Sequence, residues 1–302
     1  MVRHMRALGG GIAVAAICVA AVVGTNGSGW LLALAAVALL GGGAWSAYDF
    51  TRARRLHDEY QTFAHSHGWE YLARSFEYDS RFASFPFGEG GARRQESVVR
   101  GEFNGQRCAT FAQVYEIARE RGAPATVHAY QVTMAELPVA LPRIDIVPQS
   151  LPATLAKALG GRDIDVESHE FNVRWRVLCD DARYGHAVID PRMIERLLYS
   201  DVEGMAVRIE GGAVYVWTAG RQGAHDLARR LAVVSGIARR IPAHVIREFT
   251  ELGYKVRHGD AATRPLTGPA WAIEPGALTS RRYTGIGVDA DGDGIEDWRQ
   301  LG

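Results

Sequence analysis

The segment SVVRGEFNGQRCATFAQVYEI, from Ser97 to Ile117, decides the fold of the larger part of this chain. Two strand-like runs, Ser97 to Phe103 and Cys108 to Ile117, flank the dipeptide Asn104-Gly105. Asn-Gly between such runs is the strongest short-range signal for a β-hairpin, because both residues accept the positive φ angles of a type I′ turn. The segment therefore predicts two antiparallel strands.

The same rules predict the other elements of the domain. Alternating apolar residues indicate five more strands, the last two joined as a hairpin, at Thr126 to Met134, Ile144 to Val147, Phe171 to Leu178, Met205 to Ile209 and Val214 to Trp217. Helical periodicity and helix-stop residues indicate helices at Leu151 to Leu159, Asp180 to Ile189, Pro191 to Leu198 and Gly223 to Pro242. The pattern predicts an α+β fold, with a mostly antiparallel sheet covered by helices.

An uncharged stretch precedes this domain. No charged residue occurs between Arg6 and Asp49, and the polar break Thr25 to Gly29 divides the stretch into the legs 7–24 and 30–48. At about 1.5 Å per helical residue, each leg spans roughly 27 Å, close to the ~30 Å hydrocarbon core of a bilayer. We therefore predict that residues 7–48 form a two-helix transmembrane hairpin and that the lipid bilayer is a partner of this chain.

The charges at the ends of this stretch predict its orientation. Arg3 and Arg6 precede it and Arg52 follows it, whereas the turn between the legs has no charge. By the positive-inside rule, residues 1–6 and the C-terminus are cytoplasmic, which makes this a multi-pass protein of the cell membrane. A secretory signal peptide is the alternative reading of the first leg.

Three further regions follow the hairpin. Apolar residues on one face predict a juxtamembrane helix over residues 49–65, and the soluble α+β domain then covers residues 66–249. From about Thr250, periodicity weakens and Gly, Pro and Thr become more frequent, so residues 250–302 are predicted to be a C-terminal extension.

Composition excludes some classes of function. The chain has 34 basic and 34 acidic residues, and this balance argues against nucleic acid as a partner. Its three cysteines are too few for a disulfide framework. Cys18 lies in the first apolar leg, while Cys108 and Cys179 fall in strand-like segments where thiols are usually buried, and a disulfide between them is not expected in the cytoplasm.

Several segments resemble a family of bacterial membrane proteins of the DUF3137 type. They are Gly68-Trp69, HEFNVRWRVLCDD from His169 to Asp181, AVIDPRMIERLL from Ala187 to Leu198, and IEGGAVYVW from Ile209 to Trp217. The resemblance covers approximately residues 60–245. It implies an N-terminal anchor and a soluble α+β domain; the family is uncharacterised, so it implies no activity and assigns no functional residue.

Four groups of residues are candidate chemical sites, and each also has a structural explanation. His65 and His67 with Glu70 are potential metal ligands, but no third ligand has a conventional spacing. Cys179 with Asp180, Asp181 and either His169 or His186 resembles a nucleophile and base, but an aspartate here also suits a helix cap. Gly88 to Gly91 with Arg93-Arg94 is a candidate phosphate-binding loop, but it lacks the Lys-Ser/Thr of a P-loop. Asn172, beside Phe171, is a candidate site residue, but its amide group also suits the pinning of a turn.

The long helix carries the pairs Arg229-Arg230 and Arg239-Arg240. They would meet anionic lipid headgroups if this helix lay against a membrane. A solvated helix face is the alternative reading of these arginines.

One segment has the spacing of metal ligands. Asp289, Asp291, Asp293 and Asp297, with the carbonyl of Ile295, reproduce positions 1, 3, 5, 9 and 7 of a calcium loop. Gln300 stands where an EF-hand has a bidentate glutamate, so the predicted calcium affinity is weak. Calcium is therefore the one cofactor predicted, and the alternative is a solvated acidic turn.

These observations predict a membrane-anchored cytoplasmic domain that is a non-enzymatic protein- or lipid-interaction module. Its partners would be the bilayer together with another protein or a second copy of the chain. The alternatives are a membrane-tethered hydrolase-like enzyme whose site comes from distant residues, and an extracytoplasmic calcium-dependent module. No catalytic residue is predicted.

Overall fold

The structure, a computed structural model, describes residues 51–82, 84–118, 125–152 and 159–253. The chain divides into two compact units, residues 1–58 with 120–124 and residues 59–119 with 125–302. The first unit is described over residues 51–58, which are helical. The second unit also begins as a helix, over residues 59–66, and it holds all the described strands.

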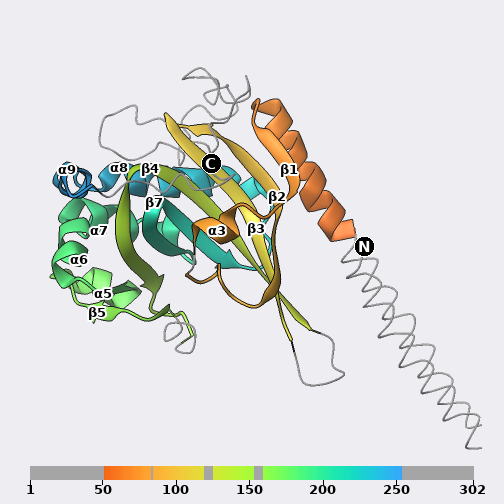
Figure 1. The fold of residues 1–302 in the computed structure, drawn as a ribbon. Coiled ribbons are helices and arrows are strands. Elements are labelled where there is room, and N and C mark those ends of the chain that lie inside the picture. Colours follow the sequence, from red (N-terminus) through yellow and green to blue (C-terminus); the bar gives the residue numbers. More distant parts are fainter. Residues whose placement is uncertain (1–50, 83, 119–124, 153–158, 254–302) are drawn as a thin grey trace, which may run out of the picture. The chain divides into compact units, whose positions relative to one another are not determined.

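Seven strands of the second unit form one antiparallel sheet (Figure 1). They are β1 (Glu70–Ser75), β2 (Gly91–Phe103), β3 (Gln106–Ile117), β4 (Thr126–Pro148), β5 (Arg162–Ile164), β6 (Trp175–Cys179) and β7 (Ala206–Ala219). The helices are α3 (Tyr78–Arg81), α5 (His169–Arg174), α6 (Ala182–Val188), α7 (Pro191–Leu198), η1 (Ser200–Val202), η2 (Ala224–Asp226), α8 (Leu227–Arg240) and α9 (Ala243–Glu251). This arrangement confirms the predicted mostly antiparallel sheet with helices.

The long strand β4 organises the sheet. Its first half pairs with β3, from Cys108 opposite Ala135 to Ile117 opposite Thr126. Its last residues pair with β6, and β7 pairs with both halves of β4. Strands β3 and β6 therefore share one edge of β4, and β7 occupies the other edge.

Each face of the sheet buries its own apolar cluster. On one face, α8 packs against β3, β4 and β7, and Tyr60 and Trp69 belong to the same core. The other face is covered by the connection between β1 and β2, which we call the strap: residues 76–90, described except for residue 83. Figure 1 shows α3, which belongs to the strap, on the opposite side of the sheet from α8.

Side chains at the helix starts explain why the chain turns where it does. Ser168 accepts a hydrogen bond from the backbone of α5, Asp181 does so for α6 and Asp190 for α7. Such caps satisfy amide groups that have no partner within the helix. Helix α8 ends at Arg240, just before Pro242, as the sequence predicts.

Five predicted strands differ in the structure: one begins as a helix, and the other four merge in pairs into β4 and β7. Residues 169–174 form α5 rather than the start of a strand, because Ser168 caps a helix there. The prolines 138 and 142 do not end β4, since they lie between Glu136 and Ile144, where its register with β7 is irregular. The predicted hairpin over residues 205–217 was wrong as well: β7 runs through Gly211 and pairs with β4 along its length.

The predicted fold class also needs a correction. Among the residues that the structure describes, no helix is both long enough and apolar enough to cross a membrane. The described part is an antiparallel sheet with helices, without the predicted two-helix transmembrane hairpin, which rested on hydropathy alone. Segments 7–24 and 30–48, to which that prediction referred, lie outside the described residues.

Candidate functional site

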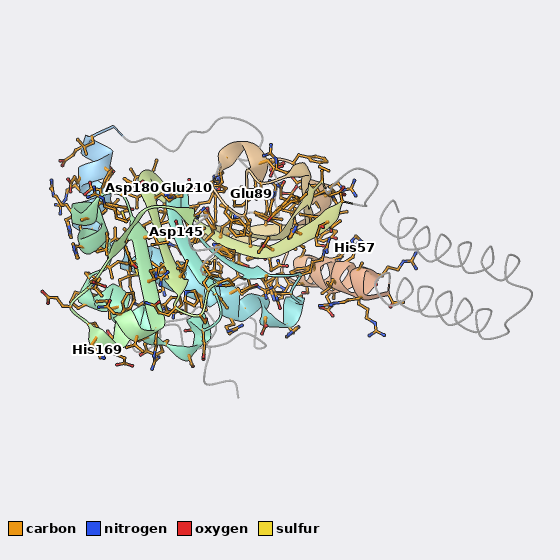
Figure 2. All side chains as sticks on the ribbon, turned by 90° about the horizontal axis from the view of Figure 1, so that it is seen from below. His57, Glu89, Asp145, His169, Asp180 and Glu210 are labelled. Carbon is orange, nitrogen blue, oxygen red and sulfur yellow. The ribbon has the colours of Figure 1, made fainter. Side chains whose placement is uncertain are left out.

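A buried ionic cluster lies where β4 and β7 meet beneath the strap. Asp145 stands opposite Arg208 in the sheet, and both side chains are fully buried. The Arg208 guanidinium donates hydrogen bonds to the Asp145 carboxylate, to the carbonyl of Phe85 and to the Tyr215 hydroxyl. Tyr215 in turn donates to Glu210 at 3.0 Å. We call Asp145, Arg208, Glu210 and Tyr215 the clasp; Figure 2 shows Asp145 and Glu210 close together.

The strap is fixed to this cluster and to its surroundings by polar contacts. The Ser84 hydroxyl donates to Glu210 at 2.7 Å, and Arg81 donates to Glu136 at 3.0 Å and to the carbonyl of Gly212 at 3.1 Å. Phe82 packs on Tyr215 with ring centroids 5.1 Å apart. Polar contacts and aromatic packing thus hold the strap at the same place.

Burial dominates the electrostatics of the clasp. Removal from water raises the pKa of Asp145 and outweighs the attraction of Arg208, which favours the charged carboxylate. Burial likewise raises the pKa of Tyr215, so its hydroxyl is a neutral hydrogen-bond donor. Because Asp145 and Arg208 have no exposed surface, this arrangement joins the strap to the sheet and offers a substrate no approach.

Other buried arginines also hold elements together. Arg196 makes two hydrogen bonds to Asp201, of 2.8 and 2.7 Å, and both side chains are almost fully buried. Arg230 donates to the Tyr60 hydroxyl at 2.9 Å and to the carbonyl of Gly223 at 3.0 Å. One arginine of each pair on α8 is buried, Arg230 and Arg240, whereas Arg229 is half-buried and Arg239 is exposed.

The histidine group does not form a metal site in the described residues. His67 Nδ1 lies 2.8 Å from the carbonyl of Phe63, and its ring stacks on the Phe63 ring. His65 is exposed, and Glu70 forms an ion pair of 3.1 Å with Arg100. No group of three or more metal-ligating side chains occurs in the part of the chain that the structure describes.

The Cys179 group is structural. Its thiol donates to the carbonyl of Asp181 at 3.2 Å, and Asp181 caps α6. Asp180, next to Cys179, is exposed, and Figure 2 shows His169 far from Asp180. Burial raises the pKa of the Cys179 thiol, which opposes formation of a thiolate.

We expect Cys108 and Cys179 to be inert in the folded chain. Both are free and buried, and burial raises the pKa of both thiols. Labelling with a thiol reagent should be at least about tenfold slower in buffer than in denaturant, because it requires local opening. Fast labelling of either residue, located by mass spectrometry in the folded protein, would contradict this expectation.

The glycine-rich loop and Asn172 are structural as well. Arg94 donates to Glu96 at 2.9 Å and Arg93 lies 3.8 Å from Asp79, so carboxylates accompany the two arginines beside the loop. The Asn172 amide group bonds both the N–H and the C=O of Val166. The structure thus confirms that Asn172 pins a turn, although on a helix rather than on a strand.

The predicted calcium ligands cannot be placed. Asp289, Asp291, Asp293, Ile295 and Asp297 lie outside the described residues, so the calcium site stays a prediction.

A different surface gathers aromatic and apolar side chains at the end of the β3–β4 pair where residues 118–125 connect the two strands; all but the buried Tyr115 are partly exposed. We call it the hairpin-end surface: Tyr115, Ile117, His128 and Tyr130. Alternate residues of a strand share a face, and the register sets Tyr115 opposite His128. Their rings stack with centroids 5.2 Å apart, and Tyr130 stacks on Tyr115 at 6.1 Å. Ile117 is 42% exposed, and His128 and Tyr130 are half-buried.

The strap supports this surface on one side. Phe85 packs on Tyr130 with centroids 4.8 Å apart. Gly90, with a φ of +56°, lies so close to the hairpin that a Cβ would come within 2.6 Å of the Glu116 carbonyl oxygen. This packing leaves the adjacent Glu89 exposed. No local sequence signal marks this surface, because its residues come together only through the pairing of β3 with β4.

Comparison with known proteins gives little further information. No family model and no curated protein matches the chain. Among solved structures, the chain is similar to the crystal structure of the mycobacterial trehalose monomycolate transport factor A, with 15% sequence identity and a TM-score of 0.45 over 63% of this chain and 97% of that chain. The resemblance to the DUF3137 type stays a prediction.

Proposed function

We propose that the described domain is a non-enzymatic protein-interaction domain and that its partner binds at the hairpin-end surface. The observation that carries this proposal is the row formed by the half-buried rings of His128 and Tyr130, both stacked on the buried Tyr115, beside the exposed Ile117. Aromatic side chains are enriched at protein interfaces, since they offer a large apolar area with a polar tip. Packing by the strap holds this row in place before binding, which limits the entropy lost on association.

The charges around the surface indicate the chemistry of the partner. Glu89 is exposed beside the row, and Glu116 is half-buried at its edge. A partner segment with one apolar or aromatic anchor and an adjacent basic side chain fits this arrangement. The anchor would pack on Tyr130 and Ile117, and the basic group would face Glu89.

A protein fits the domain better than an anionic lipid surface does. The arginines of α8 that would attract headgroups are partly withdrawn, because Arg230 and Arg240 are buried. The exposed charge next to the aromatic row is the carboxylate of Glu89, which an anionic membrane would repel. The proposed location is still the cell membrane with a cytoplasmic domain, supported by the uncharged stretch before Asp49 and the arginines around it.

The proposal is tested by site-specific crosslinking in the native cell. A photo-crosslinking amino acid placed at Ile117 should give a discrete protein adduct, whereas the same group at Val173, an exposed position of α5, should not. The crosslinked protein is then identified and its binding to the full chain is measured. Tyr130→Ala should weaken binding about tenfold or more, and Glu89→Lys should slow association, most strongly at low salt.

Two results would overturn the proposal. One is the same adducts at Ile117 and Val173, which would mean random collision. The other is flotation of the chain with anionic vesicles that Tyr130→Ala abolishes, without any protein adduct at Ile117. That outcome would assign the surface to lipid instead.

A further inference from the structure

Strand β1 is the last strand at one edge of the sheet in the part of the chain that the structure describes. It pairs with β2 in a regular register, from Glu70 opposite Arg100 to Ser75 opposite Gln95, and among the described residues no strand lies along its other side. Natural sheets usually protect such edges with prolines, bulges or inward-pointing charges. β1 has no proline, its pairing shows no bulge, and its exposed residues include Ala73 and Arg74. Phe76, directly after the strand, is 62% exposed.

The sequence of this edge is complementary to itself. Two copies of an edge strand can pair antiparallel only about a two-fold axis perpendicular to the sheet. Such an axis lies between the two strands, level with one residue, so that this residue stands opposite its own copy. An axis at Leu72 sets Glu70 opposite the partner's Arg74, and Arg74 opposite the partner's Glu70. Opposite charges at directly paired positions stabilise a sheet, so this register brings the partner's Arg74 to Glu70, which already forms an ion pair of 3.1 Å with Arg100 of its own chain.

The other residues fit the same register. On the opposite face of the sheet, Tyr71 would lie opposite the partner's Ala73, a large side chain beside a small one. Leu72 would pair with its own copy at the axis, and Phe76 would extend beyond the end of the paired strands. Axes at Tyr71 or Ala73 lack this complementarity, because they set Glu70 opposite the partner's Leu72 or Phe76.

We propose that this chain forms a homodimer in which two β1 strands pair antiparallel about Leu72 and join the two sheets into one. The partner is a second copy of the chain. Dimerisation uses β1 and leaves the hairpin-end surface available, so it does not depend on the proposed function.

Cysteine crosslinking tests the register. In the full chain with Cys18→Ser, Leu72→Cys should give a covalent dimer with oxidant or a short thiol crosslinker, since directly opposite Cβ atoms lie about 5 Å apart. Arg74→Cys alone should give none, because its two copies would be about 14 Å apart along the strands. A mixture of Glu70→Cys and Arg74→Cys chains should crosslink as a heterodimer.

Charge reversal tests the energetics without a crosslinker. Arg74→Glu sets like charges opposite each other at two positions and should raise the dimer dissociation constant about tenfold or more, measured by sedimentation. Arg74 is exposed, so circular dichroism should show an unchanged fold. The inference is overturned by a monomer in sedimentation at tens of micromolar, or by crosslinking at Leu72→Cys no stronger than at the control Val173→Cys. Either result would leave the binding test at Tyr130 unaffected.

Discussion

Asp145→Ala is expected to lower the free energy of unfolding by roughly 3–5 kcal/mol, the usual effect of removing one partner of a buried ion pair. The variant leaves the Arg208 guanidinium fully buried, and arginine cannot lose its proton to escape that environment. Glu210, 3.8 Å from Arg208, is too distant for a hydrogen bond and compensates only partly. Denaturant unfolding, monitored by circular dichroism, measures the loss.

Two variants show whether the loss comes from the uncompensated charge. The double variant Asp145→Leu/Arg208→Met should recover most of the stability, because apolar residues of similar volume often replace a buried ion pair without loss. Asp180→Ala removes an exposed carboxylate 3.9 Å from Arg143 and should change stability by less than about 0.5 kcal/mol. A loss below about 1 kcal/mol in Asp145→Ala would show that the clasp does not hold the strap.

Phe111→Ala is expected to destabilise the domain by about 3–5 kcal/mol, as large-to-small changes of buried phenylalanine do. The Phe111 side chain is fully buried under the strap, stacked on Tyr78 with centroids 4.3 Å apart and in edge contact with Phe87. The cavity would remove the contacts that Tyr78 and Phe87 of the strap make with Phe111. Hydrogen exchange should therefore speed up in residues 76–90 before it does so in α8.

Phe76→Ala is the matched control for this prediction. Phe76 is the exposed phenylalanine at the start of the strap, and its removal should change the stability of the diluted, monomeric chain by less than about 0.5 kcal/mol. If Phe111→Ala lowered stability with uniform exchange across the sheet, the strap would be an inseparable part of the core and not a separately held segment.

The turn between β2 and β3 and the cap of α6 could be read from the sequence because their causes are local. Asn104-Gly105 sets a turn with neighbouring residues only, and Asn104 and Gly105 do have the positive φ angles that such a turn needs. Asp181 and Asp190 cap the next helix within three residues of themselves. The alternation of apolar residues from Thr126 to Met134 likewise predicts a strand with one apolar face before any partner is known.

Predictions from neighbouring residues failed where a strand that is distant in sequence supplies the backbone hydrogen bonds. Gly211 and Gly212 indicate a turn, but β4 continues alongside them and keeps β7 extended. The prolines of β4 indicate strand ends, yet the irregular pairing between Glu136 and Ile144 accommodates them. The two-helix transmembrane hairpin was predicted from the uncharged stretch, and no helix among the described residues is long and apolar enough to cross a membrane.

The sequence by itself determined the β2–β3 hairpin, the starts of α6 and α7 and the buried thiols, since each depends on residue type and on neighbours along the chain. Tertiary structure alone decided which residues form the clasp and the hairpin-end surface. Asp145 and Arg208 are 63 residues apart, and each becomes tolerable in the core only opposite the other. No rule of spacing predicts such a pair, because pairing depends on the register between strands that the whole fold selects.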